Sequence, residues 1–549
     1  MPKNKALALS IALIAVLLYL LVQGNNNLPR FYFTGFDAFA AIAIVICWLA
    51  VSYTRPGFAL PRRAPGGAAV AGFAVGLCVA LWAGTYLVML NYPVSRDEHM
   101  AVFDAYAFAN GEIGYLLPPE WEGFAEAMAP AFLLETPQMN FMLSDYRPLN
   151  AGMRALVSQI GDPALTAPML AGAGLVALWW IARRTFTEKP AAVWVALGAY
   201  VLSAQILTNA MTTYAMTGHV ALNLIWLALF LKNRWWSHAL AMGLGVIAMG
   251  LHQFVFHPLF AGPFILLLVW QRRWLAFLAY AGVYGAGVLL WMSWNGIVMD
   301  LAGLERPAGG PGGIVDFIET RIIPVLTNSP GNTLALMLYN LVRALAWNAV
   351  FVLPLVVASW PLLNNAEPRK RAFIIALFGG IFLTIFVMAV VLPYQGHGWG
   401  YRYLHALIGN FALLAGFGYT QWARDDRRAA DGAVIVMGVF GAVVLIPAAM
   451  LSAHMFVKPH AELGAIAAGV DADFVIIDNT AVPNAVDEVR NWPDLSNRPL
   501  MFAASKLTPA QVATLCARGS VAVIGAREVR EVGLPGIVRK PGMTLPDGC

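Results

Sequence analysis

The chain has 549 residues, of which 59% are hydrophobic and 12% are charged, and its formal net charge at pH 7 is +5. A soluble globular domain has roughly 25% charged residues. The composition therefore excludes an ordinary soluble protein and indicates a polytopic, mainly α-helical membrane protein. The positive excess lies in loops where membrane topology accounts for it, so it gives no argument for nucleic-acid binding.

Apolar runs recur along the chain and predict about thirteen transmembrane helices. Lys3 and Lys5 precede the first run, which lacks a small-x-small cleavage site, so we expect a retained span and not a removed signal peptide. Several later runs are shorter than the ~20 residues that a bilayer crossing requires, which suggests a cavity cut into the membrane. The runs are 6–22, 38–54, 67–90, 165–182, 190–208, 219–232, 239–255, 257–271, 274–292, 332–358, 372–393, 403–420 and 432–451.

Basic loop residues decide the predicted orientation. Clusters of Arg and Lys fall on the side of the membrane that also holds Lys3, and the opposite loops hold few basic residues. By the positive-inside rule, the N-terminus is predicted to be cytoplasmic and the C-terminus extracytoplasmic. The basic clusters are Arg183-Arg184, Lys232 with Arg234, Arg272-Arg273, Arg369-Lys370-Arg371 and Arg424 with Arg427-Arg428.

The stretch Ser95–Asp104 leaves the third apolar run on the predicted extracytoplasmic side. Met100, Phe103 and Ala107 recur at helical spacing after it. They predict a short amphipathic helix on the membrane surface, and Asn110-Gly111 is a stop signal for that helix.

Asp97 and Glu98 open this helix close to the hydrocarbon, where carboxylates are costly unless they have partners or a function. One interpretation is catalytic, with the Asp97 carboxylate accepting the proton of an acceptor hydroxyl. The other is structural, because either side chain can cap the exposed N–H groups of a helix start. Asp104 lies two turns on, on the same face as Asp97. Three interpretations of Asp104 are open: it acts as a second acid, it binds a metal together with Asp97, or it belongs to a solvated helix face.

Residues 91–162 form a long acidic loop, with ten Asp and Glu against three Arg. This loop either attracts a cation or a basic acceptor, or it is a solvated extracytoplasmic surface. Within it, Tyr146 and Arg147 precede Pro148, which fixes the local backbone. An arginine beside a tyrosine can hold a phosphate through charge-assisted hydrogen bonds. The alternative is an arginine placed at the membrane interface by a turn.

Two more segments on the same side are candidates for phosphate binding. The segment 395–405 is Gly-rich and contains His397, Arg402 and Tyr403, a composition that suits a phosphate clamp or an interfacial aromatic anchor. His252 and His257 lie in a short turn between two spans, and they are phosphate donors or, with a third ligand, metal ligands. The Gly-rich loop 309–313 is interpreted as a flexible lid or linker.

After about residue 453 the composition changes to alternating strand and helix signals. We therefore divide the chain into a membrane domain, 1–452, and a small extracytoplasmic α/β domain, 453–549. The second domain has no Gly-rich dinucleotide fingerprint, so no nucleotide is assigned to it. Its predicted strands are 473–478, 499–503 and 521–525, and its predicted helix is 508–515.

Two local signals in this tail can be checked. Thr508 is expected to be the N-cap of the helix, with Pro509 in its first turn. Cys516 and Cys549 can form a disulfide if the tail is extracytoplasmic.

The order and common sidedness of these motifs resemble the GT-C superfamily of polytopic glycosyltransferases, with the aminoarabinose lipid A transferases and the protein O-mannosyltransferases as the nearest branches. Asp97-Glu98 matches the Asp-Glu pair of that family's first external loop, and Arg402-Tyr403-Leu404 matches a late Arg-Tyr-Leu. Arg147-Pro148-Leu149 is similar to a basic-Pro-Pro-Leu motif with one Pro missing. The chain departs from the family by having two spans before the Asp-Glu loop.

The resemblance implies a glycosyltransferase in the bacterial inner membrane that takes a sugar from a polyprenyl phosphate on the periplasmic face. It implies a single displacement that inverts the anomeric carbon, with Asp97 as base and Glu98 orienting Asp97 or the acceptor. The implied phosphate-binding residues are Arg147, Arg402, Tyr146, Tyr403, His252, His257 and His397. Membrane lipids and a lipid or glycan acceptor are the implied partners. Some relatives require a divalent metal and others do not.

Three other functions are compatible with parts of the sequence. A flippase or transporter of lipid-linked sugars would carry buried polar residues along the middle of several spans. A ligase that uses a diphosphate donor would need more external Arg than this chain offers. A noncatalytic partner in lipid-linked glycan assembly would use the tail domain for docking.

Overall fold

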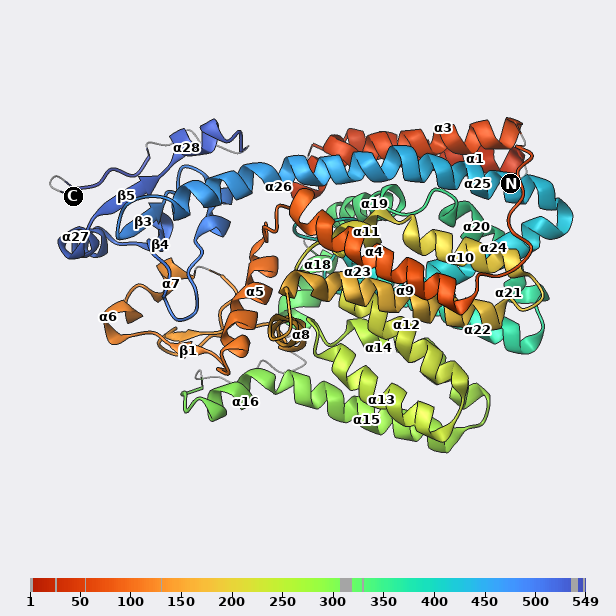
Figure 1. Ribbon diagram of the computed structural model, residues 1–549, viewed down its shortest axis with the longest axis horizontal. Helices are drawn as coiled ribbons and strands as arrows, with labels where there is room; N and C mark the ends of the chain where they lie inside the picture. Colours follow the sequence, from red (N-terminus) through yellow and green to blue (C-terminus); the bar gives the residue numbers. More distant parts are fainter. Residues whose placement is uncertain are drawn as a thin grey trace.

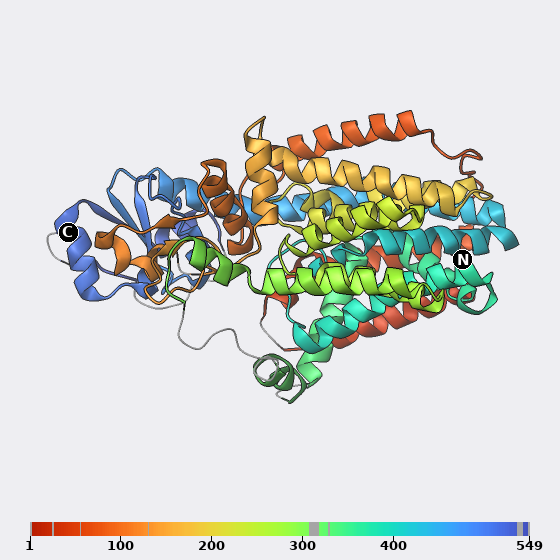
Figure 2. The same ribbon diagram turned by 90° about the horizontal axis from the view of Figure 1, so that it is seen from below.

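The computed structural model describes residues 3–24, 27–54, 56–129, 131–306, 318–327, 330–534, 542–546 and 549. It consists of a bundle of long helices with a smaller mixed unit at one end (Figures 1 and 2). The loop 309–313, for which a lid or linker was predicted, lies outside the described residues.

The helices of the first half of the chain alternate between long bundle helices and short connecting ones. Figure 1 shows α5, α6, α7 and β1 at the end of the bundle that lies away from the N-terminus. These helices are α1 (Lys3–Leu21), α2 (Leu28–Tyr32), α3 (Ala38–Thr54), α4 (Gly67–Leu87), α5 (Arg96–Ala109), α6 (Pro119–Glu122), α7 (Ala125–Met128), α8 (Leu149–Ser158), α9 (Thr166–Thr185), α10 (Pro190–Val201), α11 (Ala204–Asn209), α12 (Met216–Lys232), α13 (Trp235–Met249) and α14 (Phe256–Trp270).

The second half continues the bundle and then leaves it through one long helix, α26 (Ile446–Ala468). The expected domain boundary at 452/453 falls inside this helix. The other helices are α15 (Trp274–Met292), α16 (Trp294–Leu301), α18 (Ile323–Thr327), α19 (Pro330–Ala346), α20 (Val352–Ser359), α21 (Leu362–Asn365), α22 (Pro368–Val391), α23 (Arg402–His405), α24 (Ile408–Asp425), α25 (Arg427–Phe440), α27 (Pro509–Arg518) and α28 (Ala526–Glu531).

Each of the predicted apolar runs coincides with helix, which confirms the polytopic helical fold class. Within the described residues, seven helical stretches are long and apolar enough to cross a membrane, and five further apolar helices are shorter. The exact number of crossings stays a prediction. The seven are Asn4–Leu21, Leu28–Thr54, Gly67–Leu87, Pro163–Thr185, Trp274–Met292, Pro368–Val391 and Arg427–Ala468.

The predicted runs 190–208 and 332–358 are each broken into two helices, and these two breaks face one another. The Gln205 backbone N–H donates to the Trp347 carbonyl at 2.8 Å. The Ser203 hydroxyl caps α11 at Ile206 N and donates to the Asn348 side chain at 2.9 Å. Backbone groups freed by a break inside a bundle need such partners, because no water is there to replace them. The paired breaks therefore place polar side chains in the bundle interior.

The acidic loop and the C-terminal segment are packed together into the smaller unit. Met100 and Phe103 of α5 and Met128 of α7 share one hydrophobic core with Phe474 and Phe502 of the C-terminal strands. The Arg96 guanidinium donates to the carbonyls of Val489 and Val486, both at 2.8 Å. The C-terminal unit therefore supports α5 directly, and its removal would expose apolar side chains of the loop.

The C-terminal strands form a parallel sheet in the order β4-β3-β5, from Phe474–Ile477 (β3), Leu500–Ala503 (β4) and Val521–Ile524 (β5). A two-stranded antiparallel pair, Tyr115–Leu116 (β1) with Phe141–Met142 (β2), lies in the acidic loop. The three predicted strands are confirmed. The capping prediction is also confirmed, because the Thr508 hydroxyl accepts a hydrogen bond from Gln511 N. Cys516 and Cys549 are paired in a disulfide.

Candidate functional site

Helix α5 begins where the sequence predicted because Ser95 and Glu98 form a reciprocal capping box. The Ser95 hydroxyl accepts from Glu98 N, and the Glu98 carboxylate accepts from Ser95 N. Such a box satisfies two N–H groups that a helix start leaves without partners. It leaves the side chain of Asp97, between the two capping residues, free to turn toward the bundle.

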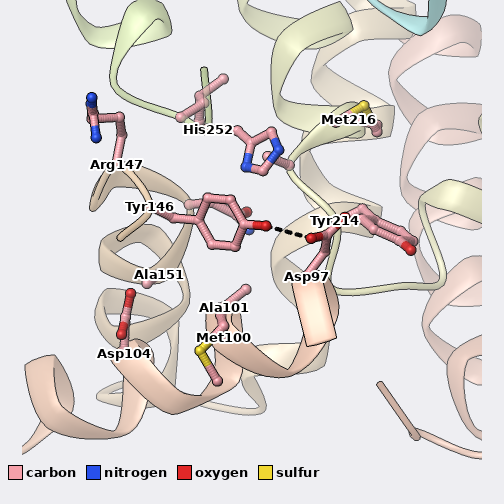
Figure 3. Close-up of a pocket in the computed structure, with 13 residues that line it drawn as sticks. Asp97, Met100, Ala101, Asp104, Tyr146, Arg147, Ala151, Tyr214, Met216 and His252 are labelled. Atoms are coloured by element: carbon pink, nitrogen blue, oxygen red, sulfur yellow. Dashed lines mark hydrogen bonds between the residues drawn. The ribbon is translucent and has the colours of Figure 1, made fainter. Parts of the chain in front are cut away.

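Asp97 meets two side chains from distant parts of the chain. The Arg402 guanidinium donates through Nη1 to Asp97 Oδ2 at 2.8 Å, and the Tyr146 hydroxyl donates to Asp97 Oδ1. Figure 3 shows the Tyr146 hydroxyl directed at Asp97, with the His252 imidazole beside the Tyr146 ring. The centroids of these two rings are 4.6 Å apart. Three of the segments predicted from separate motifs therefore converge on one carboxylate.

The charge of Asp97 follows from these contacts. Burial alone would raise the pKa of Asp97, but Arg402, His252 and the Tyr146 hydroxyl outweigh burial and hold the pKa below its ordinary value of 3.8. Burial lowers the pKa of His252 to about 4, against the opposing effect of Asp97. At neutral pH the site therefore contains an ionised carboxylate and a neutral imidazole.

Hydrogen bonds from Gln395 and from Gln205, which lies beside a helix break, hold the loop around Arg402. The Arg402 backbone N–H donates to the Gln395 side chain at 2.8 Å, and Gln395 also donates to the Gly400 carbonyl at 2.9 Å. Gln205 donates to the Tyr401 carbonyl at 2.8 Å, so α11 fixes the same loop. The Arg402 guanidinium lies over the ring of Tyr214, 4.9 Å from its centroid.

Two glycines in this loop are required by its backbone and by close approach. Gly398 and Gly400 have φ of +152° and +69°, which side-chain-bearing residues rarely adopt. A Cβ at Gly398 would lie 2.3 Å from Arg402 Cδ. The Gly-rich sequence therefore lets the loop fold tightly against the Arg402 side chain.

A cavity is lined by Asp97, Asp104, Tyr146, Arg147 and His252 among others, and it has a volume of about 20 Å³. This volume is on the order of one water molecule, so a sugar phosphate would fit only after the side chains move apart. The Nε groups of Arg147 and Arg402 have no hydrogen-bond partner among the described residues. Both atoms are buried and Arg402 is not part of the cavity lining, so a phosphate could reach them only after the side chains move.

Arg147 reaches the cavity from the loop before α8. Its Nη1 donates to the Asp145 carbonyl at 3.2 Å and to the Asn295 side chain at 3.4 Å. Asn295 in turn donates to the Asp145 carboxylate. Arg147 is therefore half-buried beside the pocket, without an ion pair among the described residues, and can reorient toward an anion.

The two other carboxylates of α5 have structural partners. Glu98 is 1% exposed, is occupied by the capping box and does not line the cavity, and burial raises its pKa to about 7. The structure thus favours the capping interpretation of Glu98 over a direct catalytic one. Asp104 accepts from Ser144 N at 2.9 Å and from the Ser144 hydroxyl, and burial raises its pKa to about 7 despite these bonds.

The structure does not bring His257 to the site. Its Nδ1 and Nε2 are bonded to Asn223 and Tyr284, each at 2.7 Å, inside the helix bundle. Because both ring nitrogens are occupied and the side chain is fully buried, the phosphate-binding prediction for His257 is wrong for this structure.

His397 and Tyr403 lie behind Arg402 and not in the cavity lining. The His397 ring stacks on Phe456 at 4.7 Å between centroids and contacts the Tyr32 hydroxyl. Tyr403 stacks on Phe256 at 5.8 Å. They are placed to support the loop around Arg402, and a direct contact to a phosphate would need a rearrangement.

The sequence leaves open whether Asp97 and Asp104 bind a metal. Among the described residues, no group of three or more His, Cys, Asp or Glu side chains is arranged to hold a metal ion. Asp97 and Asp104 both line the cavity, but each is engaged by hydroxyl donors from the loop that carries Tyr146.

Tyr214 was missed by sequence reasoning although it is central to the site. The ring of Tyr214 lies under Arg402, and its hydroxyl contacts the Ser95 hydroxyl at 2.7 Å. Tyr214 therefore connects Ser95, the N-cap of α5, to Arg402. The only sequence signal is a polar interruption, Thr212-Thr213-Tyr214, between two apolar runs on the predicted extracytoplasmic side.

Comparisons with known proteins bear on the fold. No protein-family model and no curated protein sequence matches the chain. The crystal structure of ArnT from Cupriavidus metallidurans bound to undecaprenyl phosphate is similar, with a TM-score of 0.53 and 12% identity over 82% of this chain and 89% of that chain. The apo structure of the same ArnT gives a TM-score of 0.44 and 10% identity over 78% and 84%. The chain therefore has the polytopic helical fold of ArnT, which is the class of fold that the sequence predicted.

Proposed function

We propose that the chain is a membrane glycosyltransferase, which transfers a sugar from a polyprenyl phosphate to an acceptor hydroxyl on the periplasmic face with inversion at the anomeric carbon. The observation that carries the proposal is the direct contact of Asp97 with Arg402 beside one cavity. A base for the acceptor and a cation for the leaving phosphate are the two groups that this reaction needs. The similar ArnT is a protein that binds undecaprenyl phosphate.

Donor binding begins with an exchange of partners at Arg402. The donor phosphate takes the guanidinium that Asp97 now holds, and Arg147 turns from its loop contacts to the same phosphate. This exchange opens the cavity for the sugar and releases the Asp97 carboxylate. The donor phosphodiester carries one negative charge, as the carboxylate does, but it can contact Arg147 as well as Arg402, so two guanidinium groups together favour its replacement of Asp97.

Transfer is a single displacement. The acceptor oxygen forms a bond to the anomeric carbon while the bond from that carbon to the phosphate oxygen breaks, and Asp97 accepts the acceptor proton. Arg402 and Arg147 stabilise the charge that develops on the departing phosphate. Attack opposite the leaving group inverts the anomeric carbon. Polyprenyl phosphate and protonated Asp97 remain, and the proton then passes to solvent.

Three other residues support these steps. Tyr146 orients Asp97 through its hydroxyl and keeps the carboxylate ionised. Neutral His252 is a hydrogen-bond donor or acceptor beside Tyr146. Glu98 is a positioning residue, because its capping box fixes the start of α5 and therefore the direction of Asp97.

The experiment uses the full chain purified in lipid nanodiscs and a panel of polyprenyl-phosphate sugars, chosen after mass spectrometry of the lipid that co-purifies with the Asp97→Asn variant. The measured quantity is the release of polyprenyl phosphate with acceptor present. We expect release by the wild type and by an Asp300→Asn control, which alters an exposed ion pair with Arg306, and a loss of at least about a hundredfold for Asp97→Asn. Unchanged release by Asp97→Asn would remove Asp97 as the base.

The transporter alternative gives a different result in the same preparation. A flippase moves the lipid-linked sugar between leaflets of a proteoliposome without forming a glycosidic bond. Translocation by both the wild type and Asp97→Asn, with no release of polyprenyl phosphate by either, would favour that alternative.

A further inference from the structure

A second cavity of about 300 Å³ lies on the opposite side of α5 from Asp97. We call the first cavity the Asp97 pocket. Two segments, α5 and 212–216, line both cavities with different residues and separate them. In α5, Met100 and Asp104 line the Asp97 pocket, and Val102 and Ala105 line the second cavity. In the 212–216 segment, Thr212 and Thr213 line the second cavity, and Tyr214, Ala215 and Met216 line the Asp97 pocket.

The second cavity contains a buried cation with an unused donor. Arg154 of α8 is 4% exposed, and its Nη2 donates to the Thr212 carbonyl at 3.0 Å. Its Nε has no hydrogen-bond partner among the described residues, and no described carboxylate forms an ion pair with it. A buried guanidinium in this condition is costly unless an anion completes its contacts.

The same cavity contains one carboxylate, at its rim. Asp162 Oδ2 accepts from Trp82 Nε1 and from the Tyr86 hydroxyl, both at 2.6 Å. Asp162 Oδ1 accepts from Ala164 N at 2.9 Å. The carboxylate is therefore fixed in place, ionised and half-buried, and it has lone pairs left for a further donor.

The surroundings of the cavity place its mouth at a lipid boundary. Trp82 and Tyr86 lie on the exposed face of α4, one of the helices apolar enough to span a membrane, and paired aromatic residues of this kind mark the membrane interface. Leu87 at the end of α4 is 75% exposed, and Ile160 just after α8 is 86% exposed. Apolar side chains this exposed around a cavity are expected where lipid covers them.

We propose that this second cavity binds the headgroup of a zwitterionic phospholipid, with the phosphate on Arg154 and a primary ammonium on Asp162. A cation in the interior and a carboxylate at the rim complement the two charges of a phosphoethanolamine headgroup. A purely anionic headgroup would satisfy Arg154 but would place no positive charge beside the Asp162 carboxylate. The polyprenyl-phosphate donor of the proposed function belongs in the Asp97 pocket, so this lipid site is a separate one and does not depend on the transfer reaction.

The position of the site indicates what a bound lipid does. The Thr213 hydroxyl donates to the Glu98 carbonyl at 2.8 Å, and Tyr214 follows directly under Arg402. A headgroup on Arg154 braces the segment that contacts both the start of α5 and Arg402. Bound lipid is therefore expected to stabilise the partition between the two cavities against thermal unfolding.

The test is native mass spectrometry of the full chain released from mixed micelles with phosphatidylethanolamine, phosphatidylglycerol or phosphatidylcholine. We expect a retained phosphatidylethanolamine on the wild type, with about tenfold less on Arg154→Gln, since a hydrogen bond to a charged group is lost. Asp162→Asn should lose the preference for phosphatidylethanolamine over phosphatidylglycerol. Arg306→Gln and Asp300→Asn, which alter an exposed ion pair, are the matched controls and should behave as the wild type.

A second variant keeps the proposal testable if Arg154→Gln is unstable. Ala109→Phe places a large side chain in the cavity lining and leaves both charges in place, so it should also lose the retained lipid. Equal retention of the three lipids by the wild type, or full retention by Ala109→Phe, would overturn the proposal and identify ordinary annular lipid. Asp97→Asn should retain the lipid as the wild type does, which separates this outcome from the fate of the proposed transferase.

Discussion

The contact between Asp97 and Arg402 predicts that removing the proposed base improves binding of the lipid phosphate that the donor and the product polyprenyl phosphate share. Arg402 Nη1 is 2.8 Å from Asp97 Oδ2, and in the proposed mechanism a phosphate must take this guanidinium from the carboxylate. A hydrogen bond to a charged group contributes about 1.5–3 kcal/mol, and each ~1.4 kcal/mol is tenfold in affinity. Asparagine at position 97 still accepts a neutral hydrogen bond, so we expect a Kd for polyprenyl phosphate about tenfold lower and not more than about a hundredfold lower.

The same substitution has the opposite effect on transfer. A positioned general base contributes about a hundredfold to ten-thousandfold, so Asp97→Asn should bind the donor more tightly and turn it over at least about a hundredfold more slowly. Arg402→Gln should weaken binding instead, because it removes the cation itself. The two partners of one ion pair are thus expected to act in opposite directions on Kd.

The assay is equilibrium binding of polyprenyl phosphate to the purified chain, followed by tryptophan fluorescence, with single-turnover transfer measured on the same samples. Asp300→Asn, from an exposed Asp–Arg pair, is the control for removing an aspartate charge elsewhere. If Asp97→Asn weakened binding as much as Arg402→Gln, then Asp97 would be a contributor to the lipid site and not a competitor for its cation, and the reasoning would fail.

Three further substitutions follow from individual contacts. Tyr146→Phe removes a hydrogen-bond donor that holds the pKa of Asp97 down. Transfer should therefore fall about tenfold, and the acid limb of its pH profile should move toward neutral pH. An acid limb that did not move would contradict this expectation. Glu98→Gln tests how the protonation of Glu98 affects folding stability. The pKa of Glu98 is about 7 in the folded chain and about 4.5 ordinarily, so between these pH values only the folded chain keeps the proton. The free energy of unfolding therefore falls as the pH rises. The Tm of the wild type should therefore drop more from pH 5 to pH 8 than that of Glu98→Gln, and equal drops would argue against it. Gly398→Ala puts a Cβ 2.3 Å from Arg402 Cδ and should abolish donor binding, whereas Gly396→Ala, with its Cβ 3.7 Å from Arg402, should not.

The positions of the helices along the chain were predictable because each long apolar run is a local signal. Each apolar run became helix, and Thr508 became the predicted N-cap. The N-cap of α5 is Ser95, which was not predicted, in a box with Glu98, one of the two carboxylates expected to cap that helix. The breaks at Leu202–Ser203 and at Trp347–Phe351 were not predicted, since neither contains Pro or Gly. They depend on hydrogen bonds between Gln205 and Trp347, 142 positions apart, and such pairing has no local signal.

The candidate site was predictable in its chemistry and only partly in its geometry. The predicted topology put Asp97, Arg147 and Arg402 on one side of the membrane, but nothing in the spacing indicated that residues 305 positions apart would touch. His252 and His257 looked equivalent in the sequence. His252 lies in the loop and lines the Asp97 pocket, whereas His257 lies in the first turn of α14 and faces the bundle, where Asn223 and Tyr284 satisfy it. Sequence gives residue types and sidedness here, and the helix rotation that decides which histidine is accessible comes from packing.

The closed form of the Asp97 pocket is consistent with an enzyme whose base is released by its own substrate. A carboxylate that stood open to water next to an activated sugar could direct water to the anomeric carbon as readily as an acceptor. In this structure Asp97 is 19% exposed, is paired with Arg402 and Tyr146, and faces a cavity of about 20 Å³. A ligand that brings its own anion to Arg402 can separate the pair, and in the proposed reaction that anion is the donor phosphate, which also contacts Arg147. On this argument the base becomes free only when the donor is already in place, so protection of the bound donor against hydrolysis must come from an acceptor site that excludes water.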